Sequence, residues 1–109
     1  MSRPARKLFP GSSRRARALG ARLKAARLRR RMPETQMAAR VGVSRMTIRR
    51  LEEGDPTVAL AILLRVLEVL NLDAQVDDLA LEDELGARLL EAEAPGPRRT
   101  SRIALADEL

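Results

Sequence analysis

The chain contains no cysteine and no histidine, and Phe9 is its only aromatic residue. These absences exclude disulfides, thiolate chemistry, finger-type zinc sites and the commonest general base. The core of a 109-residue chain must then come from Leu, Val, Ala, Ile and Met, which suits one helical domain. The N-terminus lacks the apolar stretch of a secretory signal, and the longest apolar run, residues 58–64, is far shorter than the ~20 residues of a membrane helix. We therefore expect a cytoplasmic protein with no cofactor and no membrane contact.

Positive charge is concentrated in one half of the chain. Residues 1–50 hold 16 Lys and Arg against a single acid, Glu34, whereas residues 51–109 hold 5 Arg against 14 acids. The basic half is suited to neutralising phosphates, while the acidic half would be repelled by nucleic acid and is free for protein contacts. An alternative explanation of the asymmetry is genomic base composition, since 19 of the 21 cations are Arg.

Proline and glycine divide the chain into three parts. Residues 1–12 have three cations and no apolar period, which predicts a flexible basic arm that either lies along nucleic acid or is simply disordered. The helical spacing of apolar residues within residues 13–94 predicts an all-α domain, a compact five-helix bundle. Pro95-Gly96-Pro97 ends regular structure, so residues 95–109 are expected to form a flexible tail.

Apolar periodicity and capping residues predict the first three helices. Apolar residues recur at helical spacing over residues 13–31, with Ser12 or Ser13 available as N-cap, and Pro33 ends this helix. Two short helices follow: residues 36–41, capped by Thr35, and residues 45–53, capped by Ser44 and stopped at Gly54.

The segment 58–70 is apolar around most of its circumference and should be buried on more than one side. Ile62 and Val69 lie off the stripe that suits the core, so either a second subunit or the last helix would cover them. That last helix is expected within residues 77–94, because acids at its start suit a helix N-terminus. The core stripe of the segment 58–70 consists of Leu60, Leu63, Val66 and Leu70, and the last helix carries Leu81, Leu85 and Leu89.

The stretch from Glu34 to Gly54 has the spacing of a helix-turn-helix. Ala38 is small enough for close helix packing, and Gly42 supplies a left-handed turn residue without steric cost. Glu52 is expected to pair with an arginine of the first helix, with Arg29 as the candidate. The residues expected to fill the space beneath are Met37, Val41, Val43, Ile48 and Leu51.

The second helix of such a unit enters the DNA major groove with its first residues. Arg45 can bond bidentately to guanine O6 and N7, which is worth ~1–3 kcal/mol of discrimination, whereas Met46 offers apolar contact, for example to a thymine methyl group. Arg49 and Arg50, one turn later, are candidates for a second base or a phosphate. The alternative for all three arginines is simple solvation at the surface.

Three polar residues are expected to contact the DNA backbone rather than the bases. They would fix the position of the helices on the duplex without distinguishing its sequence. These residues are Gln36, Ser44 and Thr47.

Residues 19–72, with the runs TQMAARVGVSRMTIRRLEEG and VLNL, resemble the Xre/Cro family of bacterial and phage repressors. The resemblance implies a lambda-repressor-like bundle that binds a palindromic operator as a homodimer. The chain departs from the family at Met32-Pro33-Glu34, where a glycine turn is usual. The positions that match the family's DNA contacts are Gln36, Ser44, Arg45, Met46 and Arg50.

The stretch GDPTVALAILLRVLEVLNL, followed by DELGARL and an arginine-rich end, looks like the small HipB-like antitoxins encoded beside HipA-type serine/threonine kinases. This resemblance implies a nucleoid-associated transcriptional repressor that autoregulates its operon and binds a HipA-like kinase toxin. The alternatives are a stand-alone Xre-type regulator without a toxin and a basic protein that binds nucleic acid without sequence preference. We do not expect an enzyme, because no activated nucleophile, phosphate loop or metal cage is present in the sequence.

Overall fold

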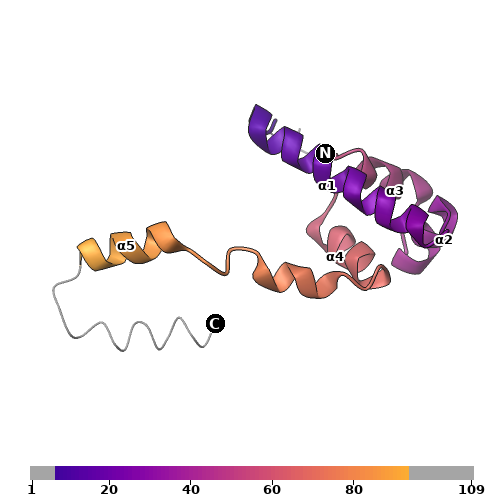
Figure 1. Ribbon diagram of the computed structural model, residues 1–109. Helices are drawn as coiled ribbons and strands as arrows, with labels where there is room; N and C mark the ends of the chain where they lie inside the picture. The colour runs from indigo at the N-terminus through magenta and orange to yellow at the C-terminus, as the bar shows by residue number, and fades with distance from the viewer. Residues whose placement is uncertain (1–6, 94–109) are drawn as a thin grey trace. The chain divides into compact units, whose positions relative to one another are not determined.

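A computed structural model describes residues 7–93, in which helices are joined by short turns and loops and there is no β-strand (Figure 1). The predicted all-α class is therefore confirmed, although a short 3-10 helix adds a sixth element to the five that the sequence predicts. The chain separates into two units, with the division between Val76 and Asp77. The elements in chain order are α1 (Pro10–Arg29), α2 (Glu34–Val41), α3 (Arg45–Glu52), α4 (Leu60–Val69), the 3-10 helix η1 (Asp73–Asp78) and α5 (Glu84–Ala92).

The first unit packs α1 to α4 around a single aliphatic core. The largest fully buried side chains come from α2, α3, α4 and the residue after α4, and α1 adds the buried Ala26. The residues predicted beneath the helix-turn-helix are buried or, for Val43, half-buried against the core. Figure 1 shows α1 lying alongside α3. The fully enclosed large side chains are Met37, Ile48, Val66 and Leu70.

The predicted core stripe of α4 is only partly correct. Val66 and Leu70 are buried, but Leu60 is 67% exposed and Leu67 is buried although the prediction omits it. Leu60 lies in the first turn of α4, where it lines an open cleft beside α1 instead of meeting the core. Ile62 and Val69 are half-buried and pack against the core. Apolar surface therefore remains exposed at the N-terminal end of α4, at Leu60.

Two helices begin earlier than predicted. The start of α1 is Pro10, because proline at the first helical position already has the required φ and lacks an N–H that would go unpaired. Neither predicted serine caps this helix, and Ser13 Oγ instead accepts a 2.8 Å hydrogen bond from Arg17. Helix α2 begins at Glu34, so Thr35 lies inside its first turn and is not the cap.

The turn between α1 and α2 forms without glycine. Arg31 takes the left-handed conformation, with φ of 53°, and its N–H donates to the Leu28 carbonyl. The N–H of Met32 then donates to the carbonyl of Arg27, which satisfies the end of α1. An arginine therefore occupies the conformation that glycine normally takes, at a cost in backbone strain.

Helices α1 and α3 touch through their backbones. A Cβ atom on Gly20 would lie 2.5 Å from the carbonyl oxygen of Glu52 and 2.7 Å from that of Leu51. Gly54, with φ of 86°, would place a Cβ only 2.6 Å from Cα of Arg17. The position of α3 thus depends on two glycines, one in α1 and one just after α3.

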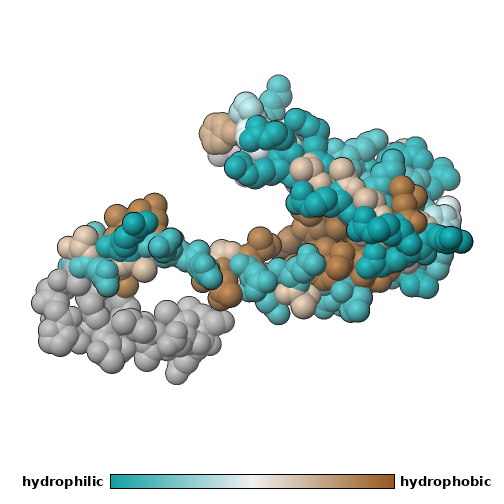
Figure 2. All heavy atoms as spheres, viewed as in Figure 1, coloured by the Kyte–Doolittle hydropathy of each residue, from teal (hydrophilic) through white to brown (hydrophobic). Residues whose placement is uncertain are grey.

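In the second unit, α5 begins at Glu84, later than predicted, because Asp83 caps it by accepting a 3.0 Å hydrogen bond from the Gly86 N–H. Asp77 and Asp78 belong to η1 instead. No residue of α5 is buried. Apolar side chains stand out on α5 in the space-filling view (Figure 2), and the exposed leucines of this unit are Leu79, Leu81, Leu85 and Leu89.

Residues 1–6 and 94–109 lie outside the described part of the chain. The predicted tail, residues 95–109, and residues 1–6 of the predicted basic arm therefore stay predictions, whereas Pro10 to Ser12 belong to α1 instead of the arm. Within residues 7–93, no helix is long and apolar enough to cross a membrane. No group of three or more acidic residues in the same range is placed to hold a metal ion.

Candidate nucleic-acid interface

The turn between α2 and α3 has the predicted geometry. Gly42 is left-handed, with φ of 86° and ψ of 35°, and its N–H donates to the Ala38 carbonyl at 2.8 Å. The N–H of Val43 donates to the same carbonyl at 3.0 Å, so the chain leaves α2 sharply. Ser44 then caps α3, its Oγ accepting from the Thr47 N–H at 3.1 Å. The helix-turn-helix arrangement is thus confirmed.

Helix α3 has one buried side and one exposed side. Ile48, Leu51 and Glu52 face the interior, as the helical period requires. The four residues predicted to contact bases are all exposed on this helix, and the apolar Met46 is 56% exposed. Those four residues are Arg45, Met46, Arg49 and Arg50.

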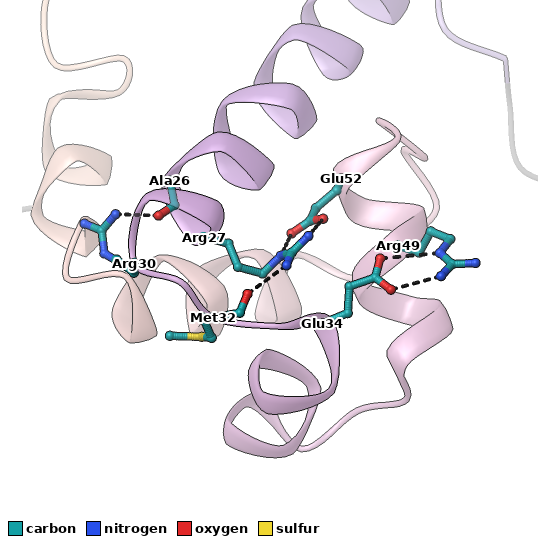
Figure 3. Close-up of polar contacts among 7 residues, drawn as sticks. All are labelled: Ala26, Arg27, Arg30, Met32, Glu34, Arg49 and Glu52. Carbon is teal, nitrogen blue, oxygen red and sulfur yellow. Dashed lines mark hydrogen bonds and ion pairs between the residues drawn. The ribbon is translucent and has the colours of Figure 1, made fainter.

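Arg49 is held by an acid from the neighbouring helix. Its Nη2 lies 2.9 Å from Oε1 of Glu34 and its Nε 3.4 Å from Oε2, so the guanidinium and the carboxylate meet side by side (Figure 3). The hydrogen bond from Arg49 is the main cause that lowers the pKa of Glu34, and the charges of Arg27 and Arg45 lower it further. The same hydrogen bond raises the pKa of Arg49. This pair is not among the contacts predicted from the sequence.

Arg50 is drawn toward the end of α3. Its Nε lies 3.2 Å from Oδ2 of Asp55. The other oxygen of this carboxylate, Oδ1, accepts hydrogen bonds from the Thr57 hydroxyl at 2.7 Å and the Thr57 N–H at 2.8 Å. The Thr57 bonds lower the pKa of Asp55 most, and Arg50 adds to the effect. Arg45, in contrast, has no ion pair or side-chain hydrogen bond with any residue in the range 7–93.

The three predicted backbone contacts are also at the surface of these helices. Gln36 is exposed in the first turn of α2. The hydroxyls of Ser44 and Thr47 lie 3.0 Å apart, and one of their two protons is shared between them. The other hydroxyl proton remains available to an oxygen acceptor such as a phosphate.

Glu52 pairs with Arg27, so the predicted pairing with Arg29 is wrong. Arg27 Nε and Nη2 lie 2.8 and 3.0 Å from the two carboxylate oxygens, and Nη1 donates to the Met32 carbonyl at 2.8 Å (Figure 3). Successive residues rotate by about 100° around a helix, so Arg29 faces almost the opposite side of α1. The hydrogen bond that Arg27 donates to Glu52 raises the pKa of Arg27 despite burial. This buried pair joins α1, α3 and the turn before α2.

Two more arginines, Arg30 and Arg65, stabilise the fold through hydrogen bonds to backbone carbonyls. Arg30 Nη2 donates to the Leu70 carbonyl at 2.9 Å, and its Nη1 donates to the Ala26 carbonyl at 2.8 Å. Arg65 Nη1 donates to the Val41 carbonyl at 3.0 Å, tying α4 to the end of α2. These hydrogen bonds satisfy carbonyl groups near the ends of α1, α4 and α2. Fewer cations are therefore available to bind a ligand than the number of Lys and Arg in the sequence suggests.

Comparison with known proteins agrees with this geometry. A family model described as a helix-turn-helix domain matches residues 18–80, which include α1 to α4 except for the start of α1. A comparison with curated proteins finds no match. The matched domain supports a DNA-binding regulator at the level of the Xre-like class. The chain therefore belongs to the helix-turn-helix domain family.

Proposed function

We propose that this protein is a sequence-specific transcriptional repressor that inserts α3 into the DNA major groove. The observation that carries the proposal is the first turn of α3, where Arg45 and Met46 are exposed and Arg45 has no partner among residues 7–93. An unpartnered arginine at this position of a helix-turn-helix is suited to bidentate bonding with a guanine.

The residues around this turn are suited to positioning the helix. Gln36 and the paired hydroxyls of Ser44 and Thr47 would bind phosphates, which fixes the register of the protein without distinguishing the sequence. The single acid among the first 50 residues leaves this half of the chain strongly basic. The resulting attraction to any duplex weakens as the salt concentration rises.

The proposal includes a homodimer on a palindromic operator. Two copies related by a twofold axis would present their α3 helices ~34–36 Å apart and occupy half-sites about one helical turn apart. Leu60, together with Leu19 and Leu63 along the cleft beside α1, offers apolar surface for such an interface. A footprint that covers one half-site at saturation would contradict the dimer.

The second unit favours a second role, the antitoxin of a HipA-like serine/threonine kinase. Helix α5 has nine residues and buries none of them, and helices of this length are marginal in water without packing. Its exposed Leu85 and Leu89 would be stabilised by a protein surface, and the acidic residues of this unit would be repelled by DNA. Co-purification of the kinase encoded beside the gene, lost in Leu85→Ala/Leu89→Ala, would support this role. If the protein is a stand-alone regulator, no such kinase will co-purify with the unaltered protein.

The test of the proposed DNA function compares two duplexes at near-physiological salt. One duplex comes from the region upstream of the protein's own gene, and the other has the same composition in scrambled order. Arg45→Ala should lower the preference for the first duplex, whereas Gln36→Ala should weaken binding to both similarly. Equal binding of the unaltered protein to both duplexes would favour the non-specific alternative.

A further inference from the structure

We infer that Glu34 is a positioning residue, which holds the Arg49 guanidinium so that this arginine contacts one base instead of any nearby phosphate. The inference rests on the proposed function, because it assumes that α3 lies in the major groove. It concerns an acid that the sequence analysis assigns to no site.

The location of Glu34 is unfavourable for DNA affinity alone. It is the only acid among residues 1–50, and it is the first residue of α2, the helix whose first turn also carries Gln36. A carboxylate there repels the phosphates that Gln36 would bind, and so it weakens binding to every duplex. An acid is also favourable at a helix N-terminus, which gives a purely structural alternative. The two explanations differ in what happens to base preference when the acid is neutralised.

The geometry of the pair supports the positioning role. Glu34 engages Nε and Nη2 of Arg49, which fixes the plane of the guanidinium through two hydrogen bonds. Figure 3 shows the third nitrogen, Nη1, pointing away from the carboxylate. The Arg49 side chain is still 46% exposed, so its outer N–H groups are accessible to a ligand. Two donors on that outer edge match the O6 and N7 acceptors of guanine.

Arg49 also has the correct place on the helix. It follows Arg45 by four residues, so both side chains lie on the same face of α3. Arg50 differs, because Asp55 holds it from the far end of α3 through one hydrogen bond. The Glu34 pair therefore adds a second oriented arginine one turn beyond Arg45.

The experiment measures affinity for the preferred and the scrambled duplex over a series of salt concentrations. Glu34→Gln should bind the scrambled duplex more tightly, with a salt slope steeper by ~0.9, because the released Arg49 neutralises one more phosphate. Its preference for the specific duplex should fall about tenfold or more, the worth of one oriented arginine contact. Arg49→Ala should lose the same preference but bind the scrambled duplex more weakly.

Glu68→Gln is the matched control, because it removes the same charge from an exposed position on α4. It should keep the full preference. Retention of the full preference by Glu34→Gln would overturn the inference, and so would an equal loss in Glu68→Gln. These outcomes are distinct from failure of the proposed function, in which the unaltered protein itself would bind both duplexes equally and both proposals would fall.

Discussion

Replacing Gly20 with alanine should displace α3 and destabilise the first unit. The added Cβ would lie 2.5 Å from the Glu52 carbonyl oxygen, whereas ordinary contact begins at 3.4 Å, so the two helices must separate by about 0.9 Å. The colliding atoms belong to backbone and cannot rotate away. Overpacking of this kind costs ~3 kcal/mol, and the better helix propensity of alanine returns ~1 kcal/mol. We expect a net loss of about 2 kcal/mol in the free energy of unfolding.

Urea unfolding followed by circular dichroism at 222 nm measures this loss directly. Gly11→Ala is the matched control in the same helix, because its Cβ would meet only the flexible end of Arg15, at 3.2 Å. That variant should be as stable as the unaltered protein or slightly more stable. If Gly20→Ala were equally stable, the close backbone contact between α1 and α3 would be wrong.

Three further predictions concern the polar and strained positions. Arg27→Met leaves Glu52 buried without its partner and should lower the free energy of unfolding in urea by ~3–5 kcal/mol. Arg27→Met/Glu52→Leu should recover most of this loss, and a double variant no more stable than the single one would contradict the prediction. Arg31→Gly should gain ~0.5–1 kcal/mol in the same assay by relieving the left-handed strain, and a loss would show that the arginine side chain matters more. Because folding lowers the pKa of Glu34 and Asp55, the unfolded chain binds protons more readily, and stability should fall as the pH drops below their ordinary values of 4.5 and 3.8. Between pH 6 and pH 3, the urea midpoint should fall less steeply with decreasing pH in Glu34→Gln/Asp55→Asn than in the unaltered protein. An unchanged pH dependence would rule out these two carboxylates as its cause.

The sequence predicts best what local chemistry decides. Gly42 and Ser44 act as expected, because a left-handed turn and an N-cap are set by one residue and its nearest backbone. The predicted start of α1 is wrong, because serine is a favourable N-cap in general but Pro10 suits the first helical position and begins the helix earlier.

Tertiary geometry decides the features that the sequence leaves open. Arg27 and Arg29 are equally basic, and only the rotation of α1 against α3 selects Arg27 as the partner of Glu52. Leu60 is exposed because it lines the open cleft beside α1, whereas Ile62 and Leu63 of the same turn pack against the core. The Glu34 pair joins residues fifteen positions apart, although a lone acid among sixteen cations is a signal that could have indicated such a pair.

The proposal that α3 distinguishes DNA sequences is tested most directly by selecting bound duplexes from a random pool at ~0.15 M salt, a concentration that screens non-specific attraction. We expect an enriched palindrome with a guanine in each half-site, half-sites about one helical turn apart, and loss of that guanine preference in Arg45→Ala. A pool that shows no enrichment, or the same enrichment with Arg45→Ala, would contradict sequence-specific binding through α3.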